Sequence, residues 1–301
     1  MSPLMSPRAT RGMAVLLGVV LLAGSALGAL GSCGGDRGGA EQGGATGGAA
    51  GGAAGGAAGS AATTATPAPS ARTPTAQVEV VARYPHDRGA FTQGLLFHQG
   101  RLFESTGQVG TSGIREVELT SGRVVREASL ERPHFGEGIV IVGDRLFQLT
   151  WQSGTAFVYD WRTFRRTGSF RYDGEGWGLT TDGASLIMST GGSSLLWRDP
   201  ATFAVTRTLP VTDHGLPVSN LNELEWVEGE IWANLWQSDQ LARINPATGE
   251  VTGYVNLAGI LPASERSGEE DVLNGIAYDP STKRLLVTGK LWPTVFEIRV
   301  R

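Results

Sequence analysis

The chain is poor in cysteine, and its first quarter lacks aromatic residues altogether. Its 301 residues include one cysteine, Cys33, which excludes an intramolecular disulfide framework and any metal site built from clustered cysteines. Residues 1–77 contain no Trp, Tyr or Phe, whereas residues 78–301 contain all 8 tryptophans. We therefore expect one folded domain at 78–301, long enough to bury a sizeable core.

Basic residues are also scarce in the expected domain. Residues 78–301 contain 21 Lys and Arg against 27 Asp and Glu, and only two of the basic residues, Lys283 and Lys290, are lysines. Binding to DNA or RNA requires a concentrated basic surface. The composition therefore argues against nucleic acid as a partner.

Residues 1–33 have the pattern of an export signal. Arg8 and Arg11 precede an uncharged stretch at 13–30, and small residues follow up to Cys33. A membrane-spanning helix is the alternative, which the glycines within the stretch disfavour. The run Leu30-Gly31-Ser32-Cys33 resembles a bacterial lipobox, in which cleavage leaves a lipid-modified cysteine at the new N-terminus.

The lipobox resemblance implies a location in the cell envelope. We expect a lipid on Cys33 to be the only membrane attachment, and Gly34 after it favours the outer membrane, with the domain on its periplasmic or exterior face. Residues 34–77 are rich in Gly and Ala, then in Ala, Thr and Pro. This composition buries too little apolar surface to offset chain entropy, so it predicts a flexible tether.

The expected domain contains a repeated pair of hairpins. A strand-like stretch, a polar turn and a second strand recur five times. Equivalent positions in the first stretch are Gly94, Gly138, Gly178, Leu224 and Gly275, at steps of 44, 40, 46 and 51 residues. A second type of turn, an acidic or amide residue followed three positions later by Thr or Ser, begins at Glu118, Asp160, Asp199 and Asn245.

Two hairpins in each period of about 40–50 residues are typical of a four-stranded propeller blade. The fifth period lacks a final strand of its own, and a strand at 78–84 has no partner. The sequence therefore predicts an all-β, five-bladed propeller whose ring is closed by pairing of 78–84 with 295–300. An ordinary β-sandwich is the alternative.

Propellers gather the starts of their inner strands around one mouth of the central channel, where ligands usually bind. The residues at these starts are Gln93, Glu137, Trp177, Asn222 and Asn274, and the second strands are followed by Trp151, Trp236 and Lys290. These side chains are the candidates for chemistry.

The motifs at these positions resemble those of the glutaminyl-peptide cyclotransferases of plant and bacterial type, also called glutamine cyclotransferases. They are Phe91-Thr-Gln-Gly94, Phe103-Glu-Ser-Thr-Gly107, Phe135-Gly-Glu-Gly138, Gly176-Trp-Gly-Leu179, Leu221-Asn-Glu-Leu-Glu225, Trp232-Ala-Asn-Leu-Trp236, Asp271-Val-Leu-Asn-Gly-Ile-Ala277 and Thr288-Gly-Lys-Leu-Trp-Pro293. The resemblance covers about residues 84–300 and leaves out the leader and the tether.

The resemblance implies a five-bladed propeller and an aminoacyltransferase. Such an enzyme converts the N-terminal glutamine of a peptide or protein to pyroglutamate and releases ammonia. It implies no metal and no other cofactor, and we expect a monomer. The alternative is a lipoprotein propeller without an active site, acting as a scaffold in the envelope.

The resemblance and the chemistry together assign roles to the polar candidates. Glu137 is expected to shuttle the proton, Gln93 and Asn222 to hold the amide or the amine, and Lys290 to stabilise developing negative charge. The alternatives are a solvated glutamate in a glycine turn and a solvated surface lysine. A base on the Leu-Asn-Glu-Leu-Glu run, at Glu223 or Glu225, is a further alternative.

Phe91, Trp151, Trp177 and Trp236 are expected to form the walls of an apolar pocket, with packing between blades as the alternative. That packing role is expected for the other tryptophans, which are Trp161, Trp197, Trp226, Trp232 and Trp292. The acidic run from Glu265 to Asp271 is compatible with calcium, but its spacing favours a solvated loop.

Overall fold

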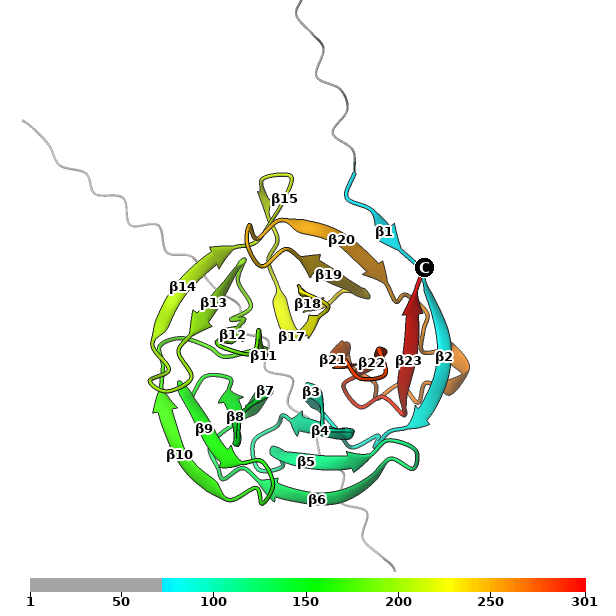
Figure 1. Cartoon of the computed structure of the whole chain (residues 1–301). Helices are drawn as coiled ribbons and strands as arrows, with labels where there is room; N and C mark the ends of the chain where they lie inside the picture. The colour runs from blue at the N-terminus through cyan, green and yellow to red at the C-terminus, as the bar shows by residue number, and fades with distance from the viewer. Residues whose placement is uncertain (1–71) are drawn as a thin grey trace, which may run out of the picture. The chain divides into compact units, whose positions relative to one another are not determined.

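The structure, a computed structural model, describes residues 72–301. They form five sheets set around a central axis, which confirms the predicted five-bladed propeller (Figure 1). The expected signal segment at 1–33, the lipid on Cys33 and the tether up to residue 71 lie outside the described residues. In the described part, the one short 3₁₀ helix is η1 (Ala263–Glu265), and no helix has the length and apolar character needed to cross a bilayer.

Each blade has four antiparallel strands, which follow one another from the central channel outwards. Blade 1 consists of β3 (Thr92–His98), β4 (Arg101–Thr106), β5 (Gly113–Glu118) and β6 (Arg123–Ser129). Blade 2 consists of β7 (Gly136–Val142), β8 (Arg145–Thr150), β9 (Thr155–Asp160) and β10 (Arg166–Arg171). Blade 3 consists of β11 (Leu179–Thr181), β12 (Leu186–Met188), β13 (Ser194–Arg198) and β14 (Val205–Pro210).

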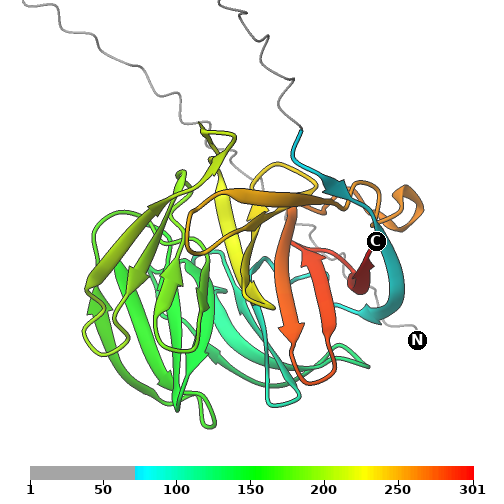
Figure 2. The same cartoon turned by 45° about the horizontal axis from the view of Figure 1, so that its top comes forward.

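Blade 4 consists of β17 (Leu221–Val227), β18 (Glu230–Leu235), β19 (Gln240–Ile244) and β20 (Val251–Asn256). Blade 5 consists of β21 (Leu273–Asp279), β22 (Arg284–Gly289), β23 (Thr294–Val300) and β2 (Val78–Pro85). A small hairpin of β15 (Thr212–Asp213) and β16 (Leu216–Pro217) projects from the connection between blades 3 and 4 (Figure 2).

The ring closes as predicted, between the first and last strands of the domain. β2 pairs antiparallel with β23, with Val78 opposite Val300 and Pro85 opposite Thr294. The structure differs from the expected tether boundary at residue 77, because β1 (Thr75–Ala76) pairs in parallel with β20 of blade 4. The folded part therefore begins before Val78, and a fifth strand lies on the outer edge of blade 4.

Five clusters of buried apolar side chains fill the spaces between neighbouring blades. Trp161 packs with Phe103 between blades 1 and 2, Trp197 lies between blades 3 and 4, and Trp232 and Trp292 lie between blades 4 and 5. Trp226 packs against the cluster between blades 3 and 4. The expected core role of these five tryptophans is confirmed.

The repeated glycines lie where the inner strands approach one another most closely. A Cβ added to Gly138 would be 2.6 Å from the backbone nitrogen of Leu179, and one added to Gly178 would be 2.1 Å from the carbonyl oxygen of Asn222. Real Cβ atoms essentially never come so near to backbone. Glycine at these points lets five strands crowd around a narrow axis.

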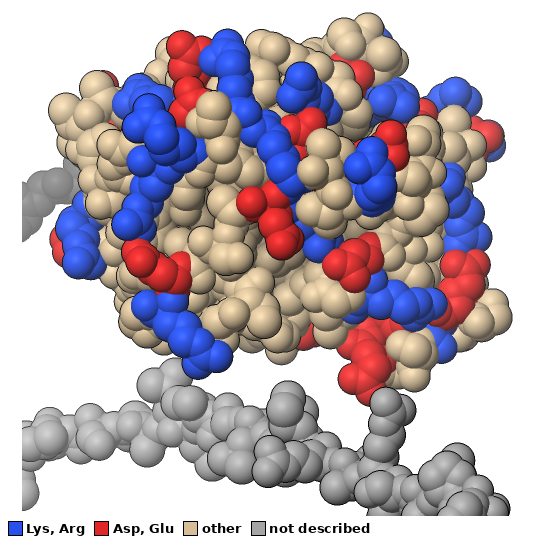
Figure 3. Space-filling model, turned by 90° about the horizontal axis from the view of Figure 1, so that it is seen from below, with Lys and Arg blue, Asp and Glu red and all other residues tan. Residues whose placement is uncertain are grey.

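Arginine side chains of blades 1, 2 and 3 each bind backbone carbonyl oxygens of the next blade. Arg207 of β14 donates to the carbonyl oxygens of Pro246 and Ala247 at 2.9 and 2.8 Å and lies 4.7 Å from the ring centroid of Trp197. The planar guanidinium of arginine can stack on an aromatic ring while its forked N–H groups bind carbonyl oxygens. On the face shown in Figure 3, basic and acidic side chains lie interspersed rather than in a patch of one sign.

Candidate active site

Irregularities in four inner strands turn polar side chains towards one mouth of the channel. The register with the second strand shifts between Thr92 and Gly94, Gly136 and Ile139, Leu221 and Leu224, and Leu273 and Ile276. The residues inside these shifts include Gln93, Glu137, Asn222 and Asn274. Bulges of this kind release a residue from the ladder and redirect its side chain.

Three of these side chains, Gln93, Glu137 and Asn222, line a pocket of about 430 Å³ at the mouth, which we call the mouth pocket. It is lined by Phe91, Gln93, Phe135, Glu137, Trp151, Trp177, Asn222, Trp236, Gln237, Asp271, Val272 and Lys290. The eight residues that the sequence assigned to catalysis or to the apolar wall are all among them, whereas Asn274, also a candidate, does not line this pocket. The mouth pocket thus combines an aromatic wall with a few polar groups, the usual composition of a ligand site.

Glu137 places a carboxyl group in this pocket with only 5% of the residue exposed. Gln93 donates a hydrogen bond from Nε2 to its Oε1 at 3.1 Å. Burial raises the pKa of Glu137 well above its ordinary range; the charge of Lys290 opposes this effect and that of Glu175 adds to it. The burial contradicts the alternative of a fully solvated glutamate in a glycine turn.

Lys290 is also buried, at 6% exposure, and is therefore not a solvated surface lysine. Its Nζ lies 4.8 Å from the ring centroid of Phe91. Burial lowers the pKa of Lys290, while the charges of Glu137 and Asp271 work in the opposite direction. Burial thus moves Glu137 and Lys290 towards their neutral forms, and such opposed shifts of neighbouring groups in one pocket are typical of functional sites.

The aromatic wall is held by edge contacts and by one carboxylate. The rings of Trp177 and Trp236 meet edge to face with their centroids 5.5 Å apart. The ring centroids of Phe135 and Trp151 are 5.7 Å apart. Glu175 accepts the indole N–H of Trp151 at 2.8 Å and that of Trp177 at 2.9 Å. One side chain thus orients two walls of the pocket.

The amide side chains are tied together across the channel. Asn274 donates from Nδ2 to the carbonyl oxygen of Thr92 at 3.0 Å and to Oε1 of Gln93 at 3.2 Å. Because Gln93 in turn donates to Glu137, a chain of hydrogen bonds leads from blade 5 through blade 1 to blade 2. Asn222 is 2% exposed and lines the pocket from blade 4.

Glu223 and Glu225, the alternative candidates for the base, accept hydrogen bonds from backbone N–H groups of the inner strands instead. Glu223 accepts the backbone N–H groups of Leu95 at 3.1 Å and Ile276 at 2.9 Å, and Glu225 accepts that of Tyr278 at 2.8 Å. These amides lie on the inner edges of β3 and β21, which lack a neighbouring strand to pair with. Neither glutamate lines the mouth pocket.

A buried ionic network supports the loops that carry Phe91 and Lys290. The ring nitrogens of His86 lie 2.7 Å from the carbonyl oxygen of Trp292 and 3.0 Å from Oε1 of Glu104. Both partners are acceptors, so both nitrogens must donate, as in an imidazolium. Arg115 binds the second oxygen of Glu104 at 2.7 Å.

The pKa shifts of this network agree with that assignment. Burial lowers the pKa of His86, but the charge of Glu104 and its hydrogen bond outweigh burial and raise the pKa above the usual value. Burial acts in the raising direction on the pKa of Glu104, but the charges of His86 and Arg115 outweigh it and bring the pKa down to about 2. The directions of these shifts and the hydrogen-bond geometry thus both favour an imidazolium at His86 paired with a carboxylate at Glu104.

Sequence reasoning missed four lining residues, Phe135, Gln237, Asp271 and Val272, and the orienting residue Glu175. Phe135 and Asp271 begin motifs that were recognised, so their position was a usable signal. Glu175 and Gln237 lie in loops whose course the pattern of strands does not reveal.

The one group of described residues that could hold a metal ion lies outside the mouth pocket. Among the described residues, the group with suitable atoms is Asp213, His214 and Glu250, whose ligand atoms lie within 4.8 Å of one another. It lies at the β15–β16 hairpin and contributes no residue to the mouth pocket. In the acidic run at 265–271, Glu265 pairs with Arg83 and Glu270 with Arg88.

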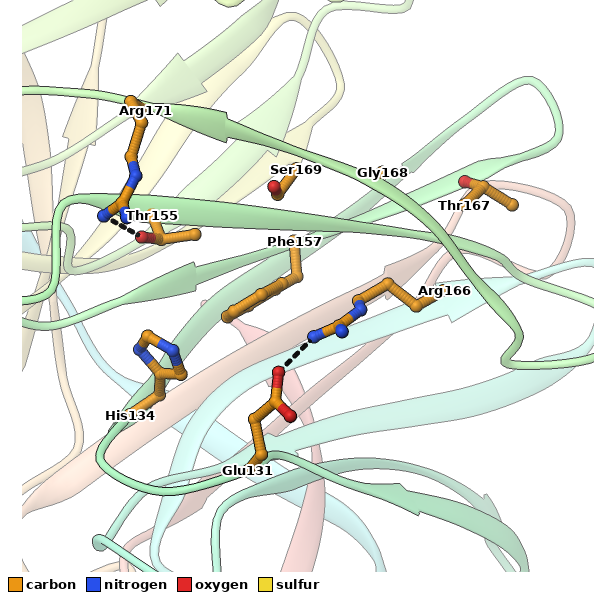
Figure 4. A pocket seen from close by; sticks show the side chains of 9 residues that line it. All are labelled: Glu131, His134, Thr155, Phe157, Arg166, Thr167, Gly168, Ser169 and Arg171. Atoms are coloured by element: carbon orange, nitrogen blue, oxygen red, sulfur yellow. Dashed lines mark hydrogen bonds and ion pairs between the residues drawn. The ribbon is translucent and has the colours of Figure 1, made fainter.

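Another hollow, of about 450 Å³, lies beside β9 and β10 of blade 2 (Figure 4). Its arginines already have partners, since Arg166 pairs with Glu131 and Arg171 donates to Thr155 at 2.9 Å. It has neither a buried carboxyl group nor a tryptophan wall. The mouth pocket is therefore the better candidate for an active site.

Comparison with known proteins identifies the family of the chain. A family model described as glutamine cyclotransferase matches residues 53–300. A glutaminyl-peptide cyclotransferase of Arabidopsis thaliana is 45% identical over 229 residues, which are 75% of this chain and 72% of the relative. The crystal structure of Myxococcus xanthus glutaminyl cyclase superposes with a TM-score of 0.72 at 40% identity, covering 76% of this chain and 98% of that one. The chain therefore belongs to the glutamine cyclotransferase family.

Proposed function

We propose that the mouth pocket performs the reaction of a glutaminyl-peptide cyclotransferase, with Glu137 as the group that moves the proton. The observation that carries this assignment is the place of Glu137, a carboxyl group of raised pKa that is buried in the lining of this pocket, hydrogen-bonded by Gln93 and enclosed by aromatic side chains. The substrate is the N-terminal glutamine of a peptide or protein. The products are the pyroglutamyl peptide and ammonia.

The reaction is an internal acyl transfer. The α-amine nitrogen attacks the γ-carbonyl carbon, a C–N bond forms, and the bond to the leaving nitrogen breaks. One proton must leave the attacking nitrogen, and one must reach the departing nitrogen. Glu137 can accept the first and deliver it as the second, because a carboxyl group with a pKa nearer to neutrality works in both directions.

The remaining polar groups stabilise the charge that develops on the γ-carbonyl oxygen. Lys290 and Asn222 line the pocket from blades 5 and 4, on other blades than Glu137. Both can donate hydrogen bonds to an oxyanion inside a site with little water. Gln93 donates to Glu137 and so fixes the direction of its carboxyl group.

The aromatic wall has two tasks in this reaction. Trp177, Trp236 and Trp151 can fold the glutamine side chain back onto its own amine, which supplies the proximity an intramolecular closure needs. They also keep water from the acyl carbon, since attack by water would give glutamate instead of pyroglutamate. A scaffold without an active site has no need for such an arrangement.

The test is the product formed from a short peptide that begins with glutamine. We expect the purified protein to release ammonia from it and to leave a pyroglutamyl peptide by mass spectrometry. The same peptide beginning with asparagine should not react, because its closure would give a four-membered ring. Glutamate as the product, or no ammonia from correctly folded protein, would refute the proposal.

We also propose that a lipid on Cys33 attaches the enzyme to the outer membrane as a monomer. Support comes from the lipobox-like sequence and from the lack of any other cysteine. Cys33→Ser should move the protein from the membrane fraction to the soluble fraction with unchanged activity. A processed Cys33→Ser protein that still sediments with membranes would contradict the lipid.

A further inference from the structure

A second cavity opens directly beside the mouth pocket, between blades 4 and 5. Its volume is about 390 Å³, and we call it the side pocket. It is lined by Gln237, Ser238, Asp239, Arg266, Glu270, Asp271, Val272, Leu273 and Trp292. Gln237, Asp271 and Val272 line both cavities, so the two are contiguous.

One wall of the side pocket is the connection at 257–272, between β20 and β21. The connections at 130–135 and 172–178, which join other blades, are much shorter. A blade does not need so long a link, and long ordered loops in compact domains usually serve binding. We call this connection, residues 257–272, the rim of the mouth.

This rim is held in place by ion pairs with the segment before blade 1. Arg88 binds the carboxylate of Glu270 at 2.9 Å and the carbonyl oxygen of Glu265 at 3.1 Å. Glu270 also accepts the backbone N–H of Ser267 at 2.9 Å. The wall is therefore preformed, which lowers the entropy cost of binding a ligand against it.

A peptide substrate must leave the mouth pocket on its carboxyl side. The α-carbonyl group of the reacting glutamine continues into a second residue, and one extended residue advances the chain by about 3.3–3.6 Å. A side chain that follows the glutamine needs a space that adjoins the mouth pocket without being part of it. The side pocket meets this requirement because it shares one wall with the mouth pocket.

The charges of the side pocket favour a cation. Glu270 is neutralised by Arg88, but Asp239 and Asp271 form no ion pair within residues 72–301. Arg266 is the only basic side chain in the lining, and it bonds the carbonyl oxygen of Leu261 at 3.4 Å. Asp239 and Asp271 thus add two carboxylates to a lining that holds one guanidinium, and Asp271 also acts on the charge of Lys290 in the mouth pocket.

We propose that the side pocket binds the residue after the N-terminal glutamine and selects for arginine or lysine there. This inference rests on the proposed function of the mouth pocket. An exposed ion pair contributes about 0.2–1 kcal/mol. We therefore expect kcat/KM to be higher by up to about 5-fold for arginine than for alanine at this position, and lower again for glutamate.

The experiment compares three tripeptide amides, Gln-Arg-Ala, Gln-Ala-Ala and Gln-Glu-Ala, each normalised to glutamine amide, which ends before the side pocket. Asp239→Asn should reduce the arginine-to-alanine ratio about 2- to 5-fold, mainly through KM, because the pair acts equally in the ground and transition states. Arg266→Gln should raise the same ratio. Glu127→Gln, which removes an exposed acid far along blade 1, is the matched control and should leave the ratio unchanged.

The outcomes separate the two proposals. If glutamine amide is not cyclised, the proposed function of the mouth pocket fails. If glutamine amide is cyclised but the three peptides react equally well, or Asp239→Asn and Glu127→Gln change the ratio alike, the side pocket is not a specificity site. High salt should weaken the preference, because both carboxylates are exposed.

Discussion

Replacing Glu137 by glutamine tests the mechanism most directly, because it removes one property and keeps the others. Glutamine has the size of glutamate, and its oxygen can still accept the hydrogen bond that Gln93 donates at 3.1 Å. It cannot take up a proton. Positioned proton transfer contributes about 10²- to 10⁴-fold, so kcat should fall by about that factor while KM changes little.

The same substitution should stabilise the folded protein at neutral pH. The folded-state pKa of Glu137 is raised by burial, so its neutral form is favoured in the folded protein and stability is lost as pH rises from about 4.3 through the folded pKa. A neutral glutamine escapes this loss. We expect Glu137→Gln to be less active but more resistant to urea at pH 7, with the two proteins converging near pH 4.

The assay measures ammonia release and urea unfolding on the same protein samples. Glu223→Gln is the matched control, because its carboxylate accepts two backbone N–H groups and lines no part of the mouth pocket. It should keep most of its kcat, because its side chain lies outside the mouth pocket. Lys290→Met and Asn222→Ala should lie between, at about 10- to 10³-fold. If Glu137→Gln keeps more than about a tenth of the activity while folded Glu223→Gln or Glu225→Gln loses nearly all, the base lies on β17.

Two further substitutions probe the wall and the supporting network. Trp177→Ala should lower kcat/KM about 30- to 150-fold with a higher KM, since burying an aromatic ring contributes roughly 2–3 kcal/mol; an unchanged value would make Trp177 a bystander. The folded-state pKa of His86 is raised, so its contribution to stability is complete below about pH 6.5 and is lost as pH rises through the folded pKa. His86→Gln should reduce the loss of urea stability that follows as pH rises above about 6.5, and an equal slope in both proteins would contradict the imidazolium.

The propeller was predictable because its geometry leaves few choices at the axis. Gly138 and Gly178 recur at one period because a side chain there would collide with the neighbouring inner strand. The ring closure followed from the count of strands, and β2 pairs with β23 accordingly. β1 was not predictable, since Thr75 and Ala76 pair through backbone atoms and look like the tether before them.

The site was predictable to the extent that it sits at repeated positions. Gln93, Glu137 and Asn222 start equivalent inner strands, and the structure brings them into one pocket. The roles of Glu175 and His86 were not predicted, because only the folded chain brings their hydrogen-bond partners next to them. Nothing in the spacing of His86 along the chain indicates that Glu104 and Trp292 will lie on its two nitrogens.

The register shifts explain how one repeated architecture acquires one reactive group. They release Gln93, Glu137, Asn222 and Asn274, each from a different blade, so the fold offers equivalent places to three amides and one acid. Burying a neutral amide side chain costs little free energy, provided that the amide is hydrogen-bonded. Burial therefore acts on the protonation of Glu137 alone among the four, and its pKa rises without a second carboxylate at an equivalent position. A second acid there would share the proton with Glu137 and divide the titration between two groups. The chemistry of the pocket thus depends on the amides at the equivalent positions of the other blades as well as on the carboxyl group of Glu137.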